Sequence, residues 1–550
     1  MASFGVGTAI VAFALATSPA PVVVDGGAIA GVRTGDVVAY AGVPFAAPPV
    51  GALRWRAPQP VVPWPGVAIA ERPGPICMQR GFYPDDAPPE PMSEDCLTLQ
   101  LWVPTSADTP LPVMVWIHGG GLSNGSGSTP LYAGDVLARE RVIVVTINYR
   151  LGALGFLAHP ELSRESAGGW SGNYGLLDQI AALQWVQRNI AAFGGDPSRV
   201  TVFGQSSGAI SISALTTSPL AQGLFARAIA HSGGLFEPLE LAPQHGLAGA
   251  EALGDDLAAR LGATSLAALR ALPADAIVDE AFTPTIVIDG HVLRESPFDA
   301  YAAGRAHGVD LLVGYNAGEG YDFLPAGPVT AGNLTARLRE DFPPVLVSLL
   351  GPATPATDDD ALAAYVALQG QLRFGWDMLA WARLHAAAGR GHSFVYHFAA
   401  VPPGEPGARH GVEMAYVFGH PGPTWSEADR ALARAIVAAW TRFAATGDPN
   451  GAALPRWPEF SLDDERALLL GDEIHAGPLP DSAALAAIDR VYALARFVAH
   501  HLVAVAVGAL VVVLGTLALL WRGLRWALRR RGVPARGRDG ALTGRWSSPA

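Results

Sequence analysis

The sequence predicts an α/β protein in which a central, mostly parallel sheet is flanked by helices. Two continuous apolar runs, at residues 112–117 and 141–148, are typical of strands that are buried on both faces. Residues 174–193 then carry apolar side chains at helical spacing. Because strands and helices alternate along the chain, the order favours crossover connections and therefore a parallel sheet.

Residues 199–215 read as a buried strand, a tight turn and an apolar helix. The turn has the pattern G-x-S-x-G, with Ser206 between Gly204 and Gly208. Such a turn strains the serine into an elbow, and the two glycines remove Cβ atoms that would meet the neighbouring strand and helix. The hydroxyl then stands above the sheet edge, which makes Ser206 the predicted nucleophile of an ester hydrolase.

The same pattern occurs a second time, around Ser123. A flexible stretch follows it at residues 125–130, rich in glycine and serine, where the elbow requires a helix. Ser123 is therefore interpreted as a loop serine.

A nucleophilic serine needs donors for the oxyanion that forms during attack. The apolar run that ends at residue 117 is followed by His118 and three glycines. Glycines at this place let backbone N–H groups turn into the site, as in the H-G-G-G type of oxyanion loop. The predicted donors are the N–H groups of Gly120, Gly121 and Ser207.

The serine also needs a base, and the base needs an acid that orients it. In this kind of fold the chain order is serine, acid, histidine, with both partners on loops after later strands. Glu319 lies between glycines after an apolar run at 309–314, and His410 lies on a loop further along. Order alone leaves other histidines open: His392, His397, His420 and His475.

Composition excludes several classes of protein. The 550 residues carry a net charge of −12, which argues against a nucleic-acid partner. There is no C-x-x-C or H-E-x-x-H pattern, so no metal is expected, and the proposed chemistry needs no cofactor. The two cysteines, Cys77 and Cys96, are either reduced buried thiols or, in an exported protein, one disulfide.

The two ends of the chain predict export and a membrane anchor. Residues 502–521 carry no charge and would span roughly 30 Å as a helix, which matches a bilayer core. Residues 522–550 hold eight arginines and one acid, as expected for a cytoplasmic tail. Residues 1–16 resemble a signal peptide. The alternatives are a buried core helix at 502–521, or a tail anchor with the large unit in the cytosol.

The domain layout that follows has a catalytic domain at 17–485, a juxtamembrane helix at 486–501, the span at 502–521 and the tail at 522–550. It places the catalytic domain outside the cytoplasm on a single-pass membrane protein.

Between about residues 22 and 480 the chain resembles the type-B carboxylesterase (cholinesterase-like) family of α/β-hydrolases. The runs that carry the resemblance lie at 48–54, 93–97, 116–121, 148–152 and 173–208. The resemblance implies a serine esterase of the α/β-hydrolase fold. The family's G-x-N-x-x-E-G segment supports Glu319 as the acid, and its H-G-x-E segment supports His410 as the base. The family's first disulfide corresponds to Cys77 and Cys96.

The chain also departs from the family pattern beside the nucleophile. Gln205 stands where the family usually has a glutamate, and Ser207 replaces the usual alanine. Ser232 resembles a second family serine near the triad, and an orienting role is expected for it.

These observations predict a membrane-anchored serine carboxylesterase that acts on small-molecule esters through an acyl-enzyme intermediate. Since neutral His410 is the base, activity should rise with pH through roughly 6 to 7. One alternative is a recognition or adhesion module of the same fold that has little catalytic activity. Another is an amidase, lactonase or acyltransferase, because these enzymes use the same machinery.

Overall fold

The computed structural model of the chain describes residues 19–80, 91–106 and 108–531, without the side chains of 502–511 and 527–531. The predicted signal peptide at 1–16 lies outside the described residues, as does the tail from 532 onward. The chain divides into two compact units, Met1–Tyr492 and Ala493–Ala550.

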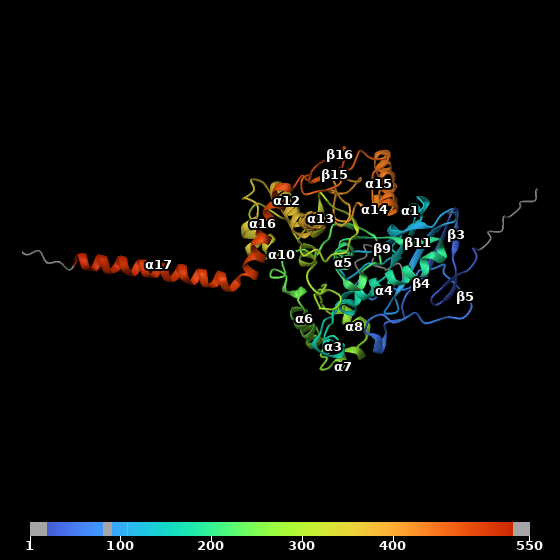
Figure 1. The fold of residues 1–550 in the computed structure, drawn as a ribbon, viewed down its shortest axis with the longest axis horizontal. Helices are drawn as coiled ribbons and strands as arrows, with labels where there is room; N and C mark the ends of the chain where they lie inside the picture. Colours follow the sequence, from blue (N-terminus) through green and yellow to red (C-terminus); the bar gives the residue numbers. More distant parts are fainter. Residues whose placement is uncertain (1–18, 81–90, 107, 532–550) are drawn as a thin grey trace, which may run out of the picture. The chain divides into compact units, whose positions relative to one another are not determined.

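An eleven-stranded sheet forms the centre of the larger unit (Figure 1). Its strands, in chain order, are β3 (Val32–Thr34), β4 (Val37–Pro44), β8 (Thr98–Pro104), β9 (Leu111–Ile117), β10 (Ile143–Ile147), β11 (Gly195–Gln205), β12 (Arg227–His231), β13 (Asp310–Asn316), β14 (Ser393–Phe398), β15 (Arg466–Leu470) and β16 (Ile474–Pro478). The spatial order is β16-β15-β14-β13-β12-β11-β9-β10-β8-β4-β3. All neighbours from β15 to β10 are parallel, and antiparallel pairs complete both edges.

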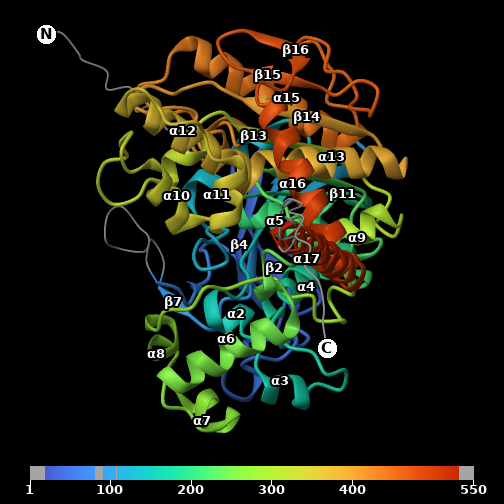
Figure 2. The same cartoon turned by 90° about the vertical axis from the view of Figure 1, so that its left-hand side faces the viewer.

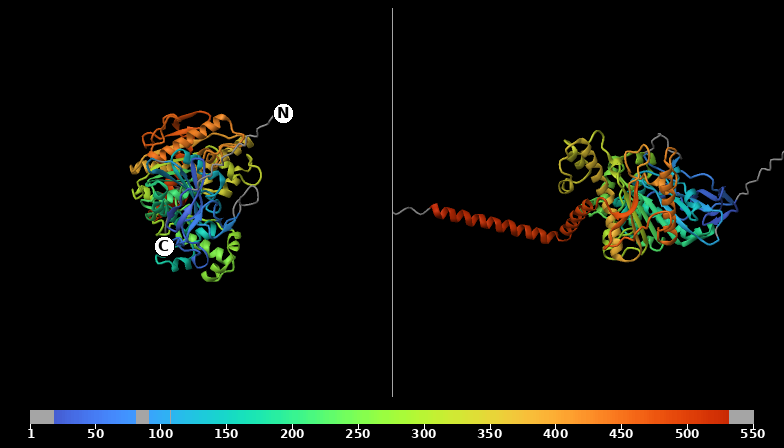
Figure 3. Two further views of the ribbon diagram at one scale, coloured as in Figure 1. Left: turned by 90° about the vertical axis from the view of Figure 1, so that its right-hand side faces the viewer. Right: turned by 90° about the horizontal axis from the view of Figure 1, so that it is seen from above.

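Two smaller sheets lie outside this main sheet. The first contains β1 (Val22–Val24), β2 (Gly27–Ala30) and β5 (Val67–Ile69), and the second pairs β6 (Ile76–Cys77) with β7 (Met92–Ser93). Figure 3 shows the N-terminal strands, in blue, at one side of the larger unit.

The helices of the larger unit connect and cover these strands. They are α1 (Asp135–Arg139), α2 (Gly152–Phe156), α3 (Pro160–Glu165), α4 (Tyr174–Asn189), α5 (Ser207–Leu215), α6 (Leu247–Arg260), α7 (Leu266–Ala271), α8 (Ala274–Asp279), α9 (Pro297–Ala302), α10 (Leu334–Asp341), α11 (Pro344–Leu350), α12 (Asp358–Gly370), α13 (Trp376–Ala388), α14 (Met414–Val417) and α15 (Glu427–Thr446). Figures 1 and 2 both show α3, α6, α7 and α8 gathered at one end of this unit, with α15, β15 and β16 at the other.

Strand β9 shows why an unbroken apolar run is needed at the centre of the sheet. Val113, Val115 and Ile117 belong to one core with residues of α4, α5 and α13. Met114 and Trp116 belong to a second core with residues of α14 and α15. Because successive side chains point to opposite faces, a strand covered on both faces must be apolar at every position. The sheet class predicted from this run is confirmed.

The C-terminal region of the chain is helical. Helix α16 (Ser482–His500) contains the boundary between the two units, and α17 (Leu502–Arg531) follows it. In the part of the chain whose side chains are described, which leaves out those of 502–511, no helix is long and apolar enough to cross a membrane. The membrane span predicted at 502–521 is thus not confirmed.

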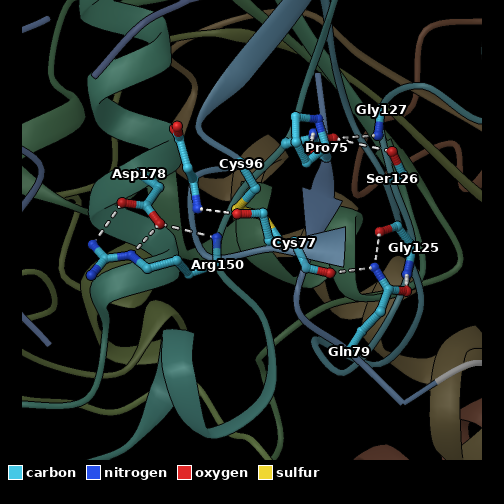
Figure 4. Close-up of a disulfide and its surroundings, with 12 residues drawn as sticks. Pro75, Cys77, Gln79, Cys96, Gly125, Ser126, Gly127, Arg150 and Asp178 are labelled. Atoms are coloured by element: carbon cyan, nitrogen blue, oxygen red, sulfur yellow. Dashed lines mark hydrogen bonds and ion pairs between the residues drawn. A yellow bond between two sulfur atoms is a disulfide. The ribbon is translucent and has the colours of Figure 1, made fainter. Parts of the chain in front are cut away.

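The two cysteines form a disulfide, as predicted. Cys77 and Cys96 are bonded and both are buried, 19 residues apart in the sequence (Figure 4). Gln79, two residues after the bridge, donates to the carbonyl of Gly125 at 3.0 Å and accepts from its N–H at 2.8 Å. The bridge therefore anchors a segment that is hydrogen-bonded to the glycine-rich loop after β9.

Replacing both cysteines by serine is expected to lower the free energy of unfolding by about 3 kcal/mol. Closing a loop of this length removes that much conformational freedom from the unfolded chain. Urea unfolding of the wild type and of the Cys77→Ser/Cys96→Ser variant, both without reductant, measures the difference. Equal midpoints would show that the bridge adds no stability.

Candidate active site

Ser206 occupies a sharp turn between β11 and α5. Its backbone has φ +55° and ψ −125°, a conformation that is rare outside glycine. Its N–H donates to the carbonyl of His231 on the neighbouring strand at 2.8 Å, which fixes the turn against the sheet.

The two glycines of the motif are required because a larger residue would not fit at either position. A Cβ at Gly204 would lie 2.7 Å from the carbonyl oxygen of Ile117, and a Cβ at Gly208 would lie 2.1 Å from the same atom. Both positions therefore exclude a side chain, as the sequence predicted. The second G-x-S-x-G match leads into turns rather than a helix, and its Ser123 hydroxyl donates to the carbonyl of Gly121 at 3.3 Å.

The predicted oxyanion loop lies directly beside the turn. A Cβ at Gly119 would lie 2.7 Å from the backbone oxygen of Gln205 and 3.0 Å from Ser206 Cβ. Gly120 and Gly121 have φ of +110° and +61°, which turn the backbone in a way that favours glycine. Over the described residues, the N–H groups of Gly120, Gly121 and Ser207 donate to no protein acceptor. They are available to an oxyanion.

His118, the first residue of this loop, is buried and has a structural role. Its ring stacks on Tyr149, whose hydroxyl donates to the His118 carbonyl at 2.8 Å. Burial lowers the pKa of His118 to about 4, so it stays neutral at physiological pH.

Glu319 and His410 are brought together by loops that follow adjacent strands, β13 and β14. His410 Nδ1 lies 2.5 Å from Glu319 Oε2. The other oxygen of Glu319 accepts from the Ser232 hydroxyl at 2.5 Å and from the Asn316 N–H at 2.7 Å. These contacts fix the carboxylate, which is 1% exposed, and give Ser232 the orienting position expected for it.

The histidines that the sequence left open lie elsewhere in the fold. His392 pairs with Glu459 at the surface, and His420 bonds the carbonyl of Ala133. His397 lies within β14 and contacts the ring of Tyr315, whereas His475 lies in the edge strand β16. Among the described residues, His410 is the histidine that bonds Glu319.

The far nitrogen of His410 contacts Gln205 rather than Ser206. His410 Nε2 lies 2.9 Å from the amide nitrogen of Gln205, and no hydrogen bond joins the Ser206 hydroxyl to His410 in the described part of the chain. Because an amide N–H can only donate, Nε2 is the acceptor and the proton of the neutral ring sits on Nδ1, facing Glu319. This is the tautomer that can take a proton from serine.

Sequence reasoning missed two further neighbours of His410. Phe374 stacks on the imidazole with ring centres 4.3 Å apart. Glu413 is buried behind the triad, where the Asn316 amide donates to it. Burial and the charge of Glu319 raise the pKa of the Glu413 carboxyl. The H-G-x-E pattern contains Glu413 and could have indicated it.

The electrostatics of the site favour the protonated imidazole. Burial lowers the pKa of His410, but the charge and hydrogen bond of Glu319, with the charges of Glu413 and Asp322, raise it above 6.5 overall. For His410 acting as the base in its neutral form, as the sequence predicts, kcat/KM is expected to rise with pH, with a midpoint above 6.5. A pH–rate profile of the wild type measures this midpoint, and a flat profile between pH 5.5 and about 8.5 would contradict the assignment.

A Gln205→Glu substitution is expected to move this midpoint up by about one pH unit or more. A carboxylate at 2.9 Å favours the imidazolium, so more alkaline conditions are needed to release the base. The profile of the variant gives the shift. Gln222→Glu, the same change at an exposed position, is the control and should leave the midpoint in place.

A cavity of about 430 Å³ opens beside the turn and the oxyanion loop. Gly121, Ser207 and Phe374 line the end near the triad. Within the described residues, no cluster of histidine, cysteine and acidic side chains could hold a metal ion.

The fold and this site define a serine hydrolase of the α/β-hydrolase class. Residues 18–479 match the model of the Carboxylesterase family, and the chain belongs to this family. It is 40% identical over 471 residues to the fumonisin B1 esterase of Sphingopyxis macrogoltabida, covering 82% of this chain and 86% of that protein. It is 37% identical to the para-nitrobenzyl esterase of Bacillus subtilis, covering 83% and 96%.

Solved structures agree with these sequence relatives. The carboxylesterase of Geobacillus stearothermophilus superposes with a TM-score of 0.75 at 33% identity, covering 85% of this chain and 99% of that one. The predicted family, fold and enzyme class are confirmed: the protein is a carboxylesterase.

Proposed function

We propose that this carboxylesterase cleaves carboxylic esters through an acyl-enzyme intermediate on Ser206, with His410 as the base and Glu319 as the orienting acid. The observation that carries the proposal is the 2.5 Å contact between His410 Nδ1 and Glu319 Oε2, which keeps the ring proton on Nδ1 and makes Nε2 the nitrogen that accepts a proton. The names of both sequence relatives are those of esterases, which supports esters as the substrates.

The reaction begins when the His410 Nε2 exchanges its contact with Gln205 for one with the Ser206 hydroxyl. Catalytic hydrogen bonds often form only with substrate bound. The hydroxyl proton passes to Nε2 while Oγ attacks the ester carbonyl carbon. The carbonyl oxygen becomes an oxyanion, which accepts from the N–H groups of Gly120, Gly121 and Ser207.

The imidazolium then gives its proton to the leaving alcohol oxygen as the C–O bond breaks, and Ser206 keeps the acyl group. Water enters, loses a proton to Nε2 and attacks the acyl carbon. The bond between that carbon and Oγ then breaks, Nε2 returns its proton to Oγ, and the acid leaves. Glu319 keeps its contact with Nδ1 throughout and stabilises the imidazolium.

Rapid mixing with 4-nitrophenyl acetate tests the proposal. We expect a burst of nitrophenolate, close to one equivalent per enzyme, when deacylation is slower than acylation. After acid quenching, mass spectrometry should find one acetyl group on the peptide that contains Ser206. Hydrolysis with the acetyl group on another residue would overturn the assignment.

We further propose that α17 anchors the protein in a membrane, with the catalytic unit outside the cytoplasm. The absence of charge over 502–521, the continuous helix Leu502–Arg531 and the arginines from 522 onward support this. The disulfide also fits an oxidising compartment. Alkaline carbonate extraction of membranes, followed by protease treatment of intact cells, tests the two parts. Release of the protein from membranes by carbonate would overturn the anchor. Protection of the catalytic unit from protease added to intact cells would overturn the orientation.

A further inference from the structure

Arg373 lies in a helical turn that packs against both partners of the nucleophile. Residues Gln371–Gly375 form a π-helical turn between α12 and α13, and such turns are frequent at functional sites. At one end, a Cβ on Gly370 would lie 3.0 Å from Glu319 Cβ, and at the other end Phe374 stacks on His410. Arg373 lies between these contacts and lines the cavity beside the oxyanion loop.

Two aromatic rings hold the Arg373 guanidinium. Its central carbon lies 4.6 Å from the ring centre of Phe323 and 5.2 Å from that of Phe342. Phe323 also packs on His410, with ring centres 5.6 Å apart. The ring of Phe323 therefore contacts both the guanidinium and the imidazole of His410.

Most of the hydrogen-bonding capacity of this guanidinium is unused. Nε donates to Gln369 at 2.7 Å, but neither Nη atom donates a hydrogen bond within the described residues. The nearest acid, Asp341, lies 3.8 Å from Nη2, beyond hydrogen-bond distance. The side chain is 32% exposed, and burial lowers its pKa, although the charges of Asp341 and Glu237 act in the opposite direction.

The carboxylates that line the cavity already have partners. Asp341 accepts from the Tyr365 hydroxyl at 2.5 Å and from the Gln369 amide at 2.6 Å. Asp377 accepts from a backbone N–H, and Glu237 lies 3.4 Å from a histidine nitrogen. In the described lining of the cavity, Arg373 is the one arginine or lysine, and it retains a planar pair of unused donors.

We propose that Arg373 binds a free carboxylate of the substrate, so that the preferred substrates are anionic esters. This inference rests on the proposed function and names its substrate class: half-esters of dicarboxylic or polycarboxylic acids, or esters whose alcohol part carries an acid. A guanidinium matches a carboxylate in a bidentate pair, and desolvation against two rings strengthens that pair.

Matched pairs of esters test the proposal on the full-length protein. In the first pair the carboxylate is in the acyl part: the mono-4-nitrophenyl ester of adipic acid against 4-nitrophenyl hexanoate. In the second it is in the alcohol part: the acetyl ester of 4-hydroxybenzoate against that of 4-methylphenol. The quantity measured is the ratio of kcat/KM between the anionic and the neutral member of each pair.

We expect Arg373→Gln to lower this ratio by about tenfold or more in at least one pair, chiefly through KM, because a charge-assisted hydrogen bond is lost. Arg373→Lys keeps the charge but lacks the planar pair of donors. Its ratio should lie between that of the wild type and that of Arg373→Gln. Arg294→Gln removes the same charge at an exposed position outside the cavity and should leave both ratios unchanged.

Unchanged ratios in Arg373→Gln for both pairs would overturn the proposal. An equal loss on the anionic and neutral esters would also overturn it, since that pattern indicates a structural role. Failure of the proposed function has a different signature: the wild type would hydrolyse neither member of either pair, or would carry the acetyl group on a residue other than Ser206.

Discussion

Replacing Ser206 by alanine is expected to lower kcat for ester hydrolysis by a factor of about 10⁴ to 10⁶, because no other group can form the acyl-enzyme. Alanine has the same Cβ as serine, so the substitution adds no strain to the backbone at φ +55°. The free energy of unfolding should therefore change little. Steady-state hydrolysis of 4-nitrophenyl acetate gives kcat, and thermal unfolding verifies the fold.

The chain contains its own control for this variant. Ser123 lies in the other G-x-S-x-G match, where turns follow in place of a helix. Ser123→Ala should keep kcat within about threefold of the wild type, since this hydroxyl only bonds a nearby carbonyl. Comparable activity of Ser206→Ala and the wild type would remove Ser206 as the nucleophile.

Replacing Glu319 by glutamine is expected to lower kcat by a factor of about 10³ to 10⁴. The glutamine oxygen can still accept from Ser232 and Asn316, so its NH₂ group must face His410 Nδ1. A donor at that place forces the ring proton onto Nε2, which is the tautomer that cannot take the serine proton. Glutamine therefore keeps the shape of the side chain but presents a donor to His410 Nδ1 in place of an acceptor.

Two measurements separate this effect from a loss of structure. The unfolding midpoint of Glu319→Gln reports the fold, and its pH–rate profile reports His410, whose midpoint should fall because the carboxylate no longer favours the imidazolium. Asp322→Asn removes a charge from the same 3-10 helix (Glu319–Phe323) without touching the bond to His410. It should keep kcat within about threefold, and a loss as large as that of Glu319→Gln would mean that local charge matters rather than this contact.

The elements that could be predicted depend on short stretches of chain. Strand β9 was identified because a strand covered on both faces leaves an unbroken apolar run, and α4 because its apolar side chains recur at helical spacing. The turn at Ser206 is predicted by the G-x-S-x-G pattern between an apolar strand and an apolar helix, and the structure adds that both glycines lie against Ile117. In each case the pattern that carries the prediction lies within a few residues of the element that it predicts.

The partners of the nucleophile were less accessible to such reasoning. Chain order admitted five histidines after Glu319, and only the family resemblance favoured His410. The contact itself joins residues 91 apart, and the contact with Gln205 joins residues 205 apart. Sequence reasoning noted Gln205 as a departure from the family, but the direct bond to Nε2 depends on how the two loops meet.

The sequence by itself therefore predicted the sheet class, the nucleophile and its oxyanion loop and, through resemblance, the family and the pairing of the cysteines. Only the tertiary structure decided which histidine bonds Glu319, which nitrogen carries its proton, and that Arg373 lies one ring away with unused donors. The physical reason is how far apart in the sequence the residues lie that determine each property. Backbone conformation and periodic burial are local properties of the chain, whereas hydrogen bonds between distant loops depend on how the sheet aligns its strand ends.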